Sequence, residues 1–369
     1  MAARPATRTV RERPVETAQP RPAVRDLSRG PASFRIDWDV RPVFDFVFSL
    51  SGDAGATDDL PAQDRTWLAD SKAAMPPEIA AEFKRLFESD VCIHVAIIAI
   101  DRPQIRTAMD VVAAVKGTPY KDVLLGMFEE GPGDQALQAL VGQALEGDQS
   151  VLPAIEELLP EWKREARIEI LREPEQTVAD LVTVLSWWEE AFSPIESRVV
   201  DIIERDYDLR SSDRETLAPV DLIERTTGGI RWLPEAGVRR VILAPSYFSR
   251  PYNFLMNAAD WRFFAYPVSD DALEASDPLA APQSVVRLHR ALGDETRLRI
   301  LKLLAGRDLY LTEIAQQLDL SKPTIKHHLA LLRSAGLVTI TESGTVVYYS
   351  LRRNRLDDAS ADIKRFLIG

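Results

Sequence analysis

Residues 321–338, SKPTIKHHLALLRSAGLV, carry two lysines and two histidines on a stretch with helical periodicity. Such side chains can hold a metal ion, transfer protons, or donate hydrogen bonds to phosphates and base edges. Adjacent residues on a helix point about 100° apart, so His327 and His328 are poorly placed to chelate one ion. The HExxH spacing of helical zinc sites is absent, and no catalytic partner stands at a recognisable spacing. We therefore predict no metal site, no cofactor and no catalytic residue.

The periodicity of this helix predicts which of its side chains reach solvent. Its buried stripe consists of apolar residues at i, i+4 and i+7, namely Ile325, Leu329 and Leu332. Lys322, Lys326 and Arg333 then lie along a largely outward face, with His327 beside them. His328 falls on the inward edge, where we expect a half-buried packing residue that bonds to a backbone carbonyl.

The flanking segments supply a framework for this helix. Successive helices, a hairpin and a last helix are predicted at 284–292, 293–306, 311–320, 321–336, 337–351 and 354–367. Asp294, Thr312 and Ser321 are the predicted N-caps, Gly336 is the predicted stop, and 343–344 is the hairpin turn. Two short helices, a tight connection and a hairpin make a winged helix-turn-helix, whose second helix enters the major groove of DNA.

Three segments of this region together resemble a known family. The stretch at about 284–355 closely resembles the ArsR/SmtB-type winged-helix transcription regulators in LHRALGDETRLRILKLL, LTEIAQQLDLSKPTIKHHLALLRSAGLV and ESGTVVYYSL. The resemblance implies a homodimeric repressor paired through its first and last helices, here 284–292 and roughly 354–367. Two copies would then bind double-stranded DNA at an operator of two-fold symmetry.

The predicted DNA contacts combine the resemblance with helix geometry. The positions that the resemblance places against DNA are Lys322, Thr324, Lys326 and His327. Lysine can bond guanine or a phosphate, and histidine can donate to either. Thr312 and Ser321 begin helices whose N-termini are natural phosphate sites. The candidate contacts from the wing are Thr345, Arg352 and Arg353.

Two features of the chain depart from that family. Its metal sensors often carry a Cys-x-Cys box before the turn, but LYLTEIAQQLDL has no cysteine. Others use His and Asp ligands on the last helix, where this chain has three aspartates but no histidine. We therefore expect no metal response of the usual kind. The second departure is the large acidic region in front of the module.

Charge divides the chain into two parts. Residues 284–369 hold 14 Lys and Arg against 9 Asp and Glu, a net charge of +5, whereas the first 283 residues have a net charge of −17. A basic module on an acidic body favours nucleic acid as its partner, because fields act locally within a Debye length of roughly 10 Å. The single cysteine, Cys92, excludes an internal disulfide and suits a reducing cytosol. The longest apolar run, 91–100, is too short for a membrane span.

The domain organisation follows from composition and periodicity. We expect a disordered basic tail at 1–30, an α-rich domain at 31–268, a linker at 269–283 and the winged helix-turn-helix at 284–369. The fold class is mainly α with small β elements. Strands at 33–40, 239–248 and 260–268 are expected to form a small antiparallel sheet in the larger domain. A new helix is expected at 193–210, with Ser193 as its cap and Pro194 in its first turn.

Three roles can be considered for residues 31–268. Aromatic and polar side chains near the predicted sheet suggest a small-molecule site, with candidate residues Trp38, Tyr247, Arg250, Asn253, Trp261 and Tyr266. The alternative interpretation of the aromatic members is an ordinary core. A second hypothesis is a module for dimerisation or protein interaction with no small-molecule effector. An enzyme is not expected, because GxGxxG, GxSxG and GxxxxGK[ST] are all absent.

Together these patterns predict a cytoplasmic, bacterial, sequence-specific DNA-binding transcription regulator. We expect a homodimeric repressor whose N-terminal domain senses a ligand or mediates assembly. The expected partners are double-stranded DNA and a small-molecule effector, with no membrane association.

Overall fold

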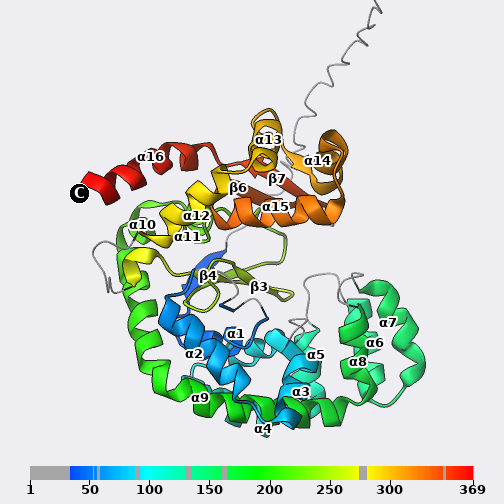
Figure 1. Ribbon diagram of the computed structural model, residues 1–369. Coiled ribbons are helices and arrows are strands. Elements are labelled where there is room, and N and C mark those ends of the chain that lie inside the picture. Colours follow the sequence, from blue (N-terminus) through cyan, green and yellow to red (C-terminus); the bar gives the residue numbers. More distant parts are fainter. Residues whose placement is uncertain are drawn as a thin grey trace, which may run out of the picture.

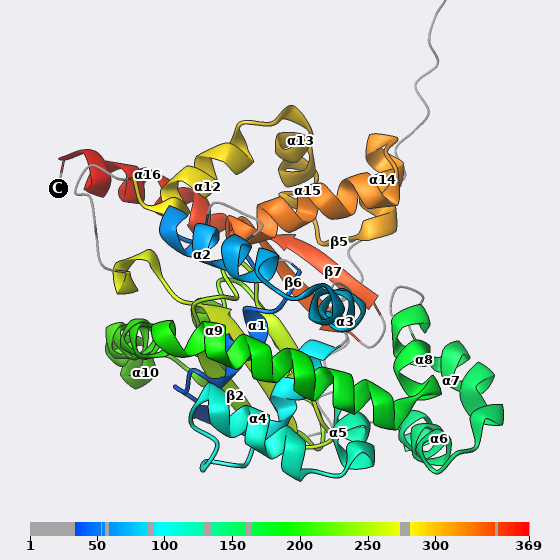
Figure 2. The same cartoon turned by 60° about the horizontal axis from the view of Figure 1, so that its bottom comes forward.

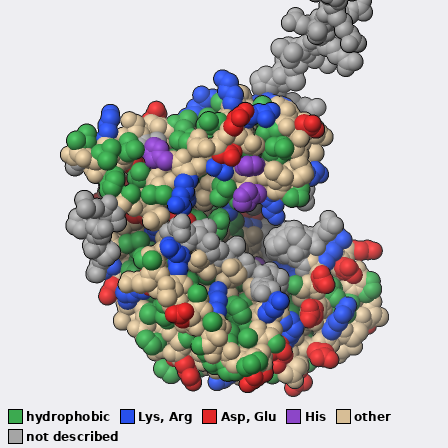
Figure 3. Space-filling view, in the orientation of Figure 1, with side chains coloured by type: hydrophobic (Ala, Val, Ile, Leu, Met, Phe, Trp, Pro, Cys, Tyr) green, Lys and Arg blue, Asp and Glu red, His purple; other side chains and the backbone are tan. Residues whose placement is uncertain are grey.

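The computed structural model describes residues 34–52, 54–55, 59–87, 92–128, 135–159, 164–273, 281–343 and 346–368. The predicted tail at 1–30 lies outside the described residues. Figure 1 shows two lobes, a larger helical body (34–273) and a smaller lobe (281–368), which we call the module. On the face drawn in Figure 3, the surface is hollowed between the module and the part of the body formed by α6–α8.

Helices make up most of the body. They are α1 (Val43–Phe48), α2 (Ala62–Ala73), α3 (Pro77–Phe87), η1 (Cys92–Ala99), α4 (Ala108–Gly117), α5 (Tyr120–Met127), α6 (Gln135–Leu145), η2 (Gln149–Val151), α7 (Leu152–Leu158), α8 (Arg164–Arg172), α9 (Pro174–Leu209), α10 (Ser211–Thr216), α11 (Pro219–Thr226) and η4 (Asp270–Ala272). None of the helices in the described part of the chain combines the length and apolar character that a membrane span requires.

The long helix α9 corrects one prediction. Instead of a new helix at 193–210, the chain runs unbroken from Pro174 to Leu209 with Pro194 inside the helix. The buried face continues on both sides of the proline, from Phe192 to Val199. Packing of that face therefore offsets the backbone hydrogen bond that a proline removes. Figure 2 shows α9 crossing the body beside α4 and α5.

A four-stranded sheet lies inside the body. Its strands, in spatial order, are β1 (Arg35–Trp38), β2 (Arg240–Ser246), β4 (Trp261–Pro267) and β3 (Phe254–Asn257). β1 pairs with β2, and β2 with β4, in parallel, whereas β3 pairs with β4 antiparallel. The prediction of an antiparallel sheet was wrong for the first two pairs, although the fold class, mainly α with small sheets, is confirmed. Residue alternation indicates which face a side chain takes but not the direction of its strand.

Both faces of this sheet are covered. β2 and β4 are buried along nearly their whole length, as is usual for parallel strands. On one face Phe263 packs against Phe44 of α1, with 4.6 Å between ring centroids, in the main core shared with η1 and α9. On the other face Leu243 and Tyr266 pack with Ile223 of α11.

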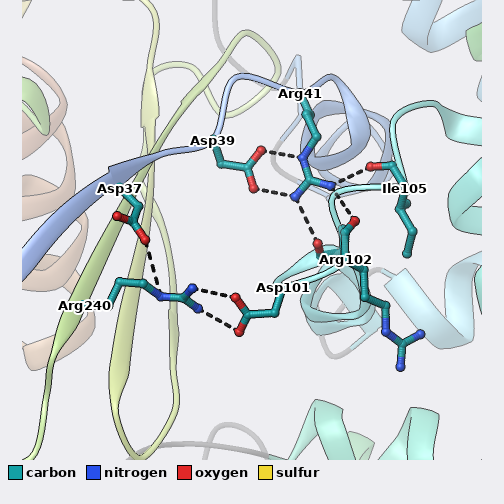
Figure 4. Close-up of polar contacts among 8 residues, drawn as sticks. Asp37, Asp39, Arg41, Asp101, Arg102, Ile105 and Arg240 are labelled. Carbon is teal, nitrogen blue, oxygen red and sulfur yellow. Dashed lines mark hydrogen bonds and ion pairs between the residues drawn. The ribbon is translucent and has the colours of Figure 1, made fainter.

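Ion pairs fasten the sheet to the segment between η1 and α4 (Figure 4). Arg240, at the start of β2, meets Asp101 through two hydrogen bonds of 2.5 and 2.8 Å, and its Nε lies 3.8 Å from Asp37. Arg41, just after β1, pairs with Asp39. Arg41 also donates to the backbone carbonyls of Ala99, Arg102 and Ile105. These contacts join the first strand to a distant segment of the helical layer.

The module has the predicted helices and hairpin in the predicted order, with one further short strand, β5 (Leu309–Tyr310). Its other elements are α12 (Gln283–Leu292), α13 (Glu295–Leu304), α14 (Leu311–Leu318), α15 (Lys322–Ser334), β6 (Val338–Ser343), β7 (Val346–Leu351) and α16 (Arg353–Ile368). The strands form an antiparallel sheet in the order β5-β7-β6. The module has a hydrophobic core of its own, separate from the two clusters of the body. This arrangement is a winged helix-turn-helix.

A buried carboxyl group positions the turn that follows β2. Asp45 of α1 is fully buried, and its Oδ1 accepts hydrogen bonds from Ser246 Oγ and Phe248 N, both at 2.7 Å. Burial raises the pKa of Asp45 to about 7, because desolvation outweighs the hydrogen bonds that favour the charged form. This turn leads directly to Arg250, which lies between the body and the module.

The raised pKa of Asp45 predicts how stability depends on pH. Between about pH 4 and about pH 7, the folded protein keeps a proton on Asp45 that the unfolded chain releases. The free energy of unfolding therefore falls as pH rises through that window. Asp45→Asn keeps an oxygen for both donors but does not titrate. We expect its stability relative to wild type to improve by roughly 1–3 kcal/mol between about pH 5 and about pH 7, measured by urea denaturation. An identical pH dependence in both proteins would contradict this.

Candidate nucleic-acid interface

The two helices of the turn pack on the core of the module. Ile314 and Ala315 of α14 are buried against Ile325 of α15 and its neighbours. Between the helices Asp319 adopts a left-handed conformation with φ 56°, which aspartate tolerates better than most residues. Leu320 N then donates to Ala315 O at 3.1 Å. This tight connection fixes the direction in which α15 leaves α14.

Both ends of α15 are closed as predicted. Ser321 Oγ accepts from Thr324 N at 3.3 Å and lies 2.7 Å from Thr324 Oγ1. At the other end Gly336 has φ 69°, and Leu337 N donates to Leu332 O at 3.0 Å. A left-handed glycine with this bond is a common helix stop. Asp294 caps α13 as predicted, accepting from Arg297 N at 2.9 Å.

The predicted outward side chains of α15 reach solvent. Those classed as exposed are Lys322, Thr324, Lys326 and His327, whereas Ile325, Leu329 and Leu332 are at most 1% exposed. The exposed residues lie in the N-terminal half of α15, where unpaired backbone N–H groups and the helix dipole favour an anion. This arrangement can present donors and positive charge to a nucleic-acid backbone or base edge.

His328 lies at the boundary between the two faces. Its side chain is 16% exposed and is thus half-buried, as predicted. In place of the predicted carbonyl, its Nδ1 faces Asp294 Oδ1 at 3.8 Å and has no hydrogen-bond partner among the described residues. The backbone N–H of Arg297 and the nearby Arg297 and His328 side chains hold the pKa of Asp294 below its ordinary value. His328 thus belongs to the packing between α13 and α15.

Thr312 does not cap α14. Tyr310 occupies the N-cap position, and Glu313 Oε2 accepts from Tyr310 N at 3.2 Å. Thr312 lies half-buried in the first turn of the helix. The prediction was wrong because the glutamate three residues after Tyr310 bonds the backbone of Tyr310, so the helix begins two residues earlier than predicted.

Two of the three predicted wing contacts donate hydrogen bonds to backbone carbonyls within the chain. Thr345 lies outside the described residues. Arg352 Nη1 donates to Gly228 O of the body at 2.9 Å. Arg353 Nη2 donates to Ala305 O, at the end of α13, at 2.6 Å. Arg352 therefore joins the module to the body in this structure.

The predicted ligand residues separate into two groups. The aromatic members belong to the core: Tyr247 and Tyr266 are fully buried and Trp261 is 8% exposed. Trp38 is half-buried and packs edge-on against Tyr266, with 6.0 Å between ring centroids. These positions favour the interpretation of an ordinary aromatic core for the four aromatic residues.

Arg250 and Asn253 instead lie where the body meets the module. Arg250 is 3% exposed, and Asn253 Nδ2 donates to Thr227 O at 3.0 Å. Three arginines of the module line the two cavities at this junction, namely Arg287, Arg333 and Arg355. Arg333 was predicted on the outward face of α15, whereas no role was predicted for Arg287 and Arg355. Their charges on amphipathic helices do not reveal this grouping, because the surface of the body that they contact is distant in sequence.

Among the described residues, no group of three or more His, Cys, Asp and Glu could hold a metal ion. We call the exposed side chains of Lys322, Thr324, Lys326 and His327 the exposed row of α15. The fold and this exposed row define a DNA-binding winged helix-turn-helix protein. A family model described as "Bacterial regulatory protein, arsR family" matches residues 294–339.

Named relatives match the same region. The transcriptional repressor SdpR of Bacillus subtilis is 40% identical over 70 residues, which are 19% of this chain and 78% of SdpR. The HTH-type transcriptional regulator KmtR of Mycobacterium tuberculosis is 38% identical over 82 residues, 22% of this chain and 63% of KmtR. The solved structure of HlyU from Vibrio cholerae is 30% identical, covers 24% of this chain and 95% of HlyU, and has a TM-score of 0.20.

The chain therefore belongs to the arsR family of bacterial regulatory proteins. It is a DNA-binding transcription regulator, and the relatives named here are regulators rather than enzymes.

The two histidines of α15 provide a test of this geometry. His328→Ala removes a half-buried ring that packs beside Asp294, and we expect a loss of about 1–2 kcal/mol in the free energy of unfolding. His327→Ala alters an exposed side chain and is expected to change stability by less than about 0.5 kcal/mol. Chemical denaturation of both variants measures the difference. A larger loss for His327→Ala would show that the helix faces are reversed.

Proposed function

We propose that the protein is a cytoplasmic homodimeric repressor that binds an operator of two-fold symmetry. In this proposal residues 284–369 bind DNA, 269–283 form a linker, and 31–268 sense a small molecule or mediate assembly. The observation that carries the DNA-binding role is the exposed row in the N-terminal half of α15. The helix-turn-helix geometry supports it, because the second helix of such a pair enters the major groove.

Each exposed residue of α15 has a distinct proposed role. Lys322 and Lys326 contact phosphates or guanine, and His327 donates to either. Ser321 and Thr324 already bond each other, so their contribution is to present the helix N-terminus to a phosphate. The positive charge of the module and the acidic body suit this division, because DNA is attracted to the module alone.

The dimer is proposed to form through α12 and α16. Apolar side chains on α16 are exposed in the single chain, with Leu356 40%, Leu367 71% and Ile368 80% exposed. Exposed apolar residues on one helix are typical of a surface that is covered in an assembly. Figure 1 shows α16 extending away from the rest of the module, where a second copy can reach it.

The alternative role of the body is protein interaction with no small-molecule effector. It is favoured by exposed apolar side chains at Met109, Leu158, Leu209 and Leu233, which are 50–64% exposed. These residues lie on separate elements, and single exposed apolar residues are common on ordinary surfaces. We therefore propose small-molecule sensing, rather than protein interaction alone, as the main role of the body.

Lys326→Ala tests the proposed DNA contact. An operator is first selected by the intact protein from random duplexes, and affinity is then measured against salt concentration. Loss of one phosphate contact should lower the slope of log K against log salt by about one unit. Loss of a base contact should instead reduce discrimination between operators by about 1–3 kcal/mol.

Lys116→Ala is the matched control for this experiment. It removes the same charge from an exposed position on α4 of the body. We expect no change in either the salt slope or the discrimination. If Lys326→Ala behaves like this control, Lys326 does not contact DNA.

Leu367→Asp tests the proposed dimer. A charge on the exposed apolar face of α16 should convert the dimer to a monomer without unfolding the chain, because Leu367 makes little contact within one chain. Sedimentation equilibrium measures the mass. Leu158→Asp, at a residue 51% exposed on α7, serves as the control and should leave the dimer intact. If the wild-type protein is a monomer, the proposed dimer is wrong.

A further inference from the structure

A small cavity lined by arginines lies between the body and the module. It has a volume of about 170 Å³ and lies between the chain after α11 and the C-terminal end of α15. Four guanidinium groups line it, those of Arg287, Arg333, Arg352 and Arg355, and no carboxylate is present among the described lining residues. Planar, bidentate donors of this kind are suited to a phosphate or carboxylate group, although Arg287 and Arg355 also pair with Asp59 and Asp362, which lie outside this lining.

A larger cavity of about 530 Å³ adjoins the first. The two share Gly228, Arg287 and Arg355, so one ligand can extend through both. The larger cavity lies where β2 and β4 end, because its lining includes Arg250 after β2 and Asp270 after β4. Ligands of parallel sheets bind outside the carboxyl ends of the strands, where backbone and loop groups converge.

The arginines of this site are held close to one another. Arg287 of α12 pairs with Asp59 of the body, yet its Nε has no hydrogen-bond partner among the described residues. Burial, and to a smaller extent the charge of Arg355, lower the pKa of Arg287 to about 10. An anion between these groups would relieve their repulsion.

Two uncharged polar atoms at the site also lack partners. Thr226 is 3% exposed and lines the larger cavity, and its Oγ1 has no hydrogen-bond partner among the described residues. Asn253 lines the smaller cavity, and its buried Oδ1 is likewise unpaired within the described part of the chain. Buried polar atoms are rarely left unsatisfied, and a ligand with its own donors and acceptors would satisfy both.

We propose that this cleft between the body and the module binds a small molecule that carries a phosphate group. The phosphate would sit among Arg287, Arg333 and Arg355, and the rest of the molecule would extend toward Thr226. This proposal names the ligand class and the location of the sensing role proposed above, and its regulatory meaning rests on that role.

The position of the cleft favours a small molecule over DNA. The exposed row of α15 is at its N-terminal half, whereas Arg333 is one residue from the C-terminal end of a 13-residue helix. Two ends of such a helix are about 18 Å apart. Arg352 also contacts Gly228 of the body, so the arginines face an interface within the chain.

A ligand in the cleft would link α15, the helix proposed to enter the major groove, to the sheet of the body. The ligand would contact the end of α15 and the start of α16 on one side, and the chain after α11 on the other. It would therefore bias the orientation of the module relative to the body. A ligand shifts such an equilibrium only by its difference in affinity for the two arrangements.

Binding is tested on the full chain without DNA, with inorganic pyrophosphate as the probe. Thermal denaturation is followed as pyrophosphate is added, against sodium chloride of equal ionic strength. We expect pyrophosphate to raise the Tm and sodium chloride to raise it less, since a ligand of the folded state stabilises by mass action. Absence of a specific rise would overturn the proposal.

Two variants locate the site. Arg355→Gln and Arg333→Gln should each weaken pyrophosphate binding by at least about tenfold, because each removes a charge-assisted hydrogen bond. Asp362, the partner of Arg355, keeps Arg365 at 3.5 Å, so Arg355→Gln leaves no isolated carboxylate. Arg333 lies on α15 and Arg355 on α16, so either variant remains informative if the other fails to fold.

Arg307→Gln is the matched control, because Arg307 belongs to the module, is 62% exposed and lies outside the lining of either cavity. It should bind pyrophosphate as the wild type does. An equal rise in Tm in all variants, or an equal loss in Arg307→Gln, would mean that the anion binds elsewhere and would overturn the proposal. The DNA titration of Lys326→Ala is independent, so failure of the ligand site and failure of DNA binding are distinguishable.

Discussion

Arg250 is the cation on which the junction between the two lobes depends. It is 3% exposed, its Nε donates to Asp59 O at 3.0 Å, and its Nη2 pairs with Asp270. Each of these partners then holds the module: Asp59 pairs with Arg287, and Asp270 Oδ2 accepts from Ser284 N at 2.6 Å. Although burial opposes it, these contacts keep the pKa of Asp270 below its ordinary value. A buried charge without partners is costly, so Arg250 holds the segments of Asp59 and Asp270 in place, and through them α12 of the module.

The junction is polar, whereas each lobe has an apolar core of its own. The core of the module does not merge with that of the body, and the contacts between them include the Arg287–Asp59 ion pair, hydrogen bonds of Ser284 and Arg352, and the backbone bridge between Ile230 and Ile340. Polar interfaces between domains resemble transient protein interfaces and allow relative motion. Under the proposed sensing role, a ligand in the arginine-lined cleft would alter the orientation of α15 relative to the body without disturbing either core.

Local signals predicted the module well and the body poorly. Helix caps at Asp294 and Ser321, the stop at Gly336 and the outward row of α15 depend on neighbours within a few residues, which the sequence displays directly. The direction of β1 relative to β2 depends instead on pairing across some 200 residues, which alternation does not encode. The helix start predicted at Pro194 was wrong for a similar reason, since the packing that keeps α9 continuous comes from other helices.

The sequence by itself determined the class of the C-terminal module, its charge, and which face of α15 is available to DNA, because helical periodicity and capping are local. Only the tertiary structure showed that Tyr247, Trp261 and Tyr266 are buried, and that Arg352 turns toward the body. Only the tertiary structure brought Arg250 and Asn253 beside arginines of the module. Such clusters form when segments far apart in the chain fold together. The residues of one segment do not indicate which other segment they will contact.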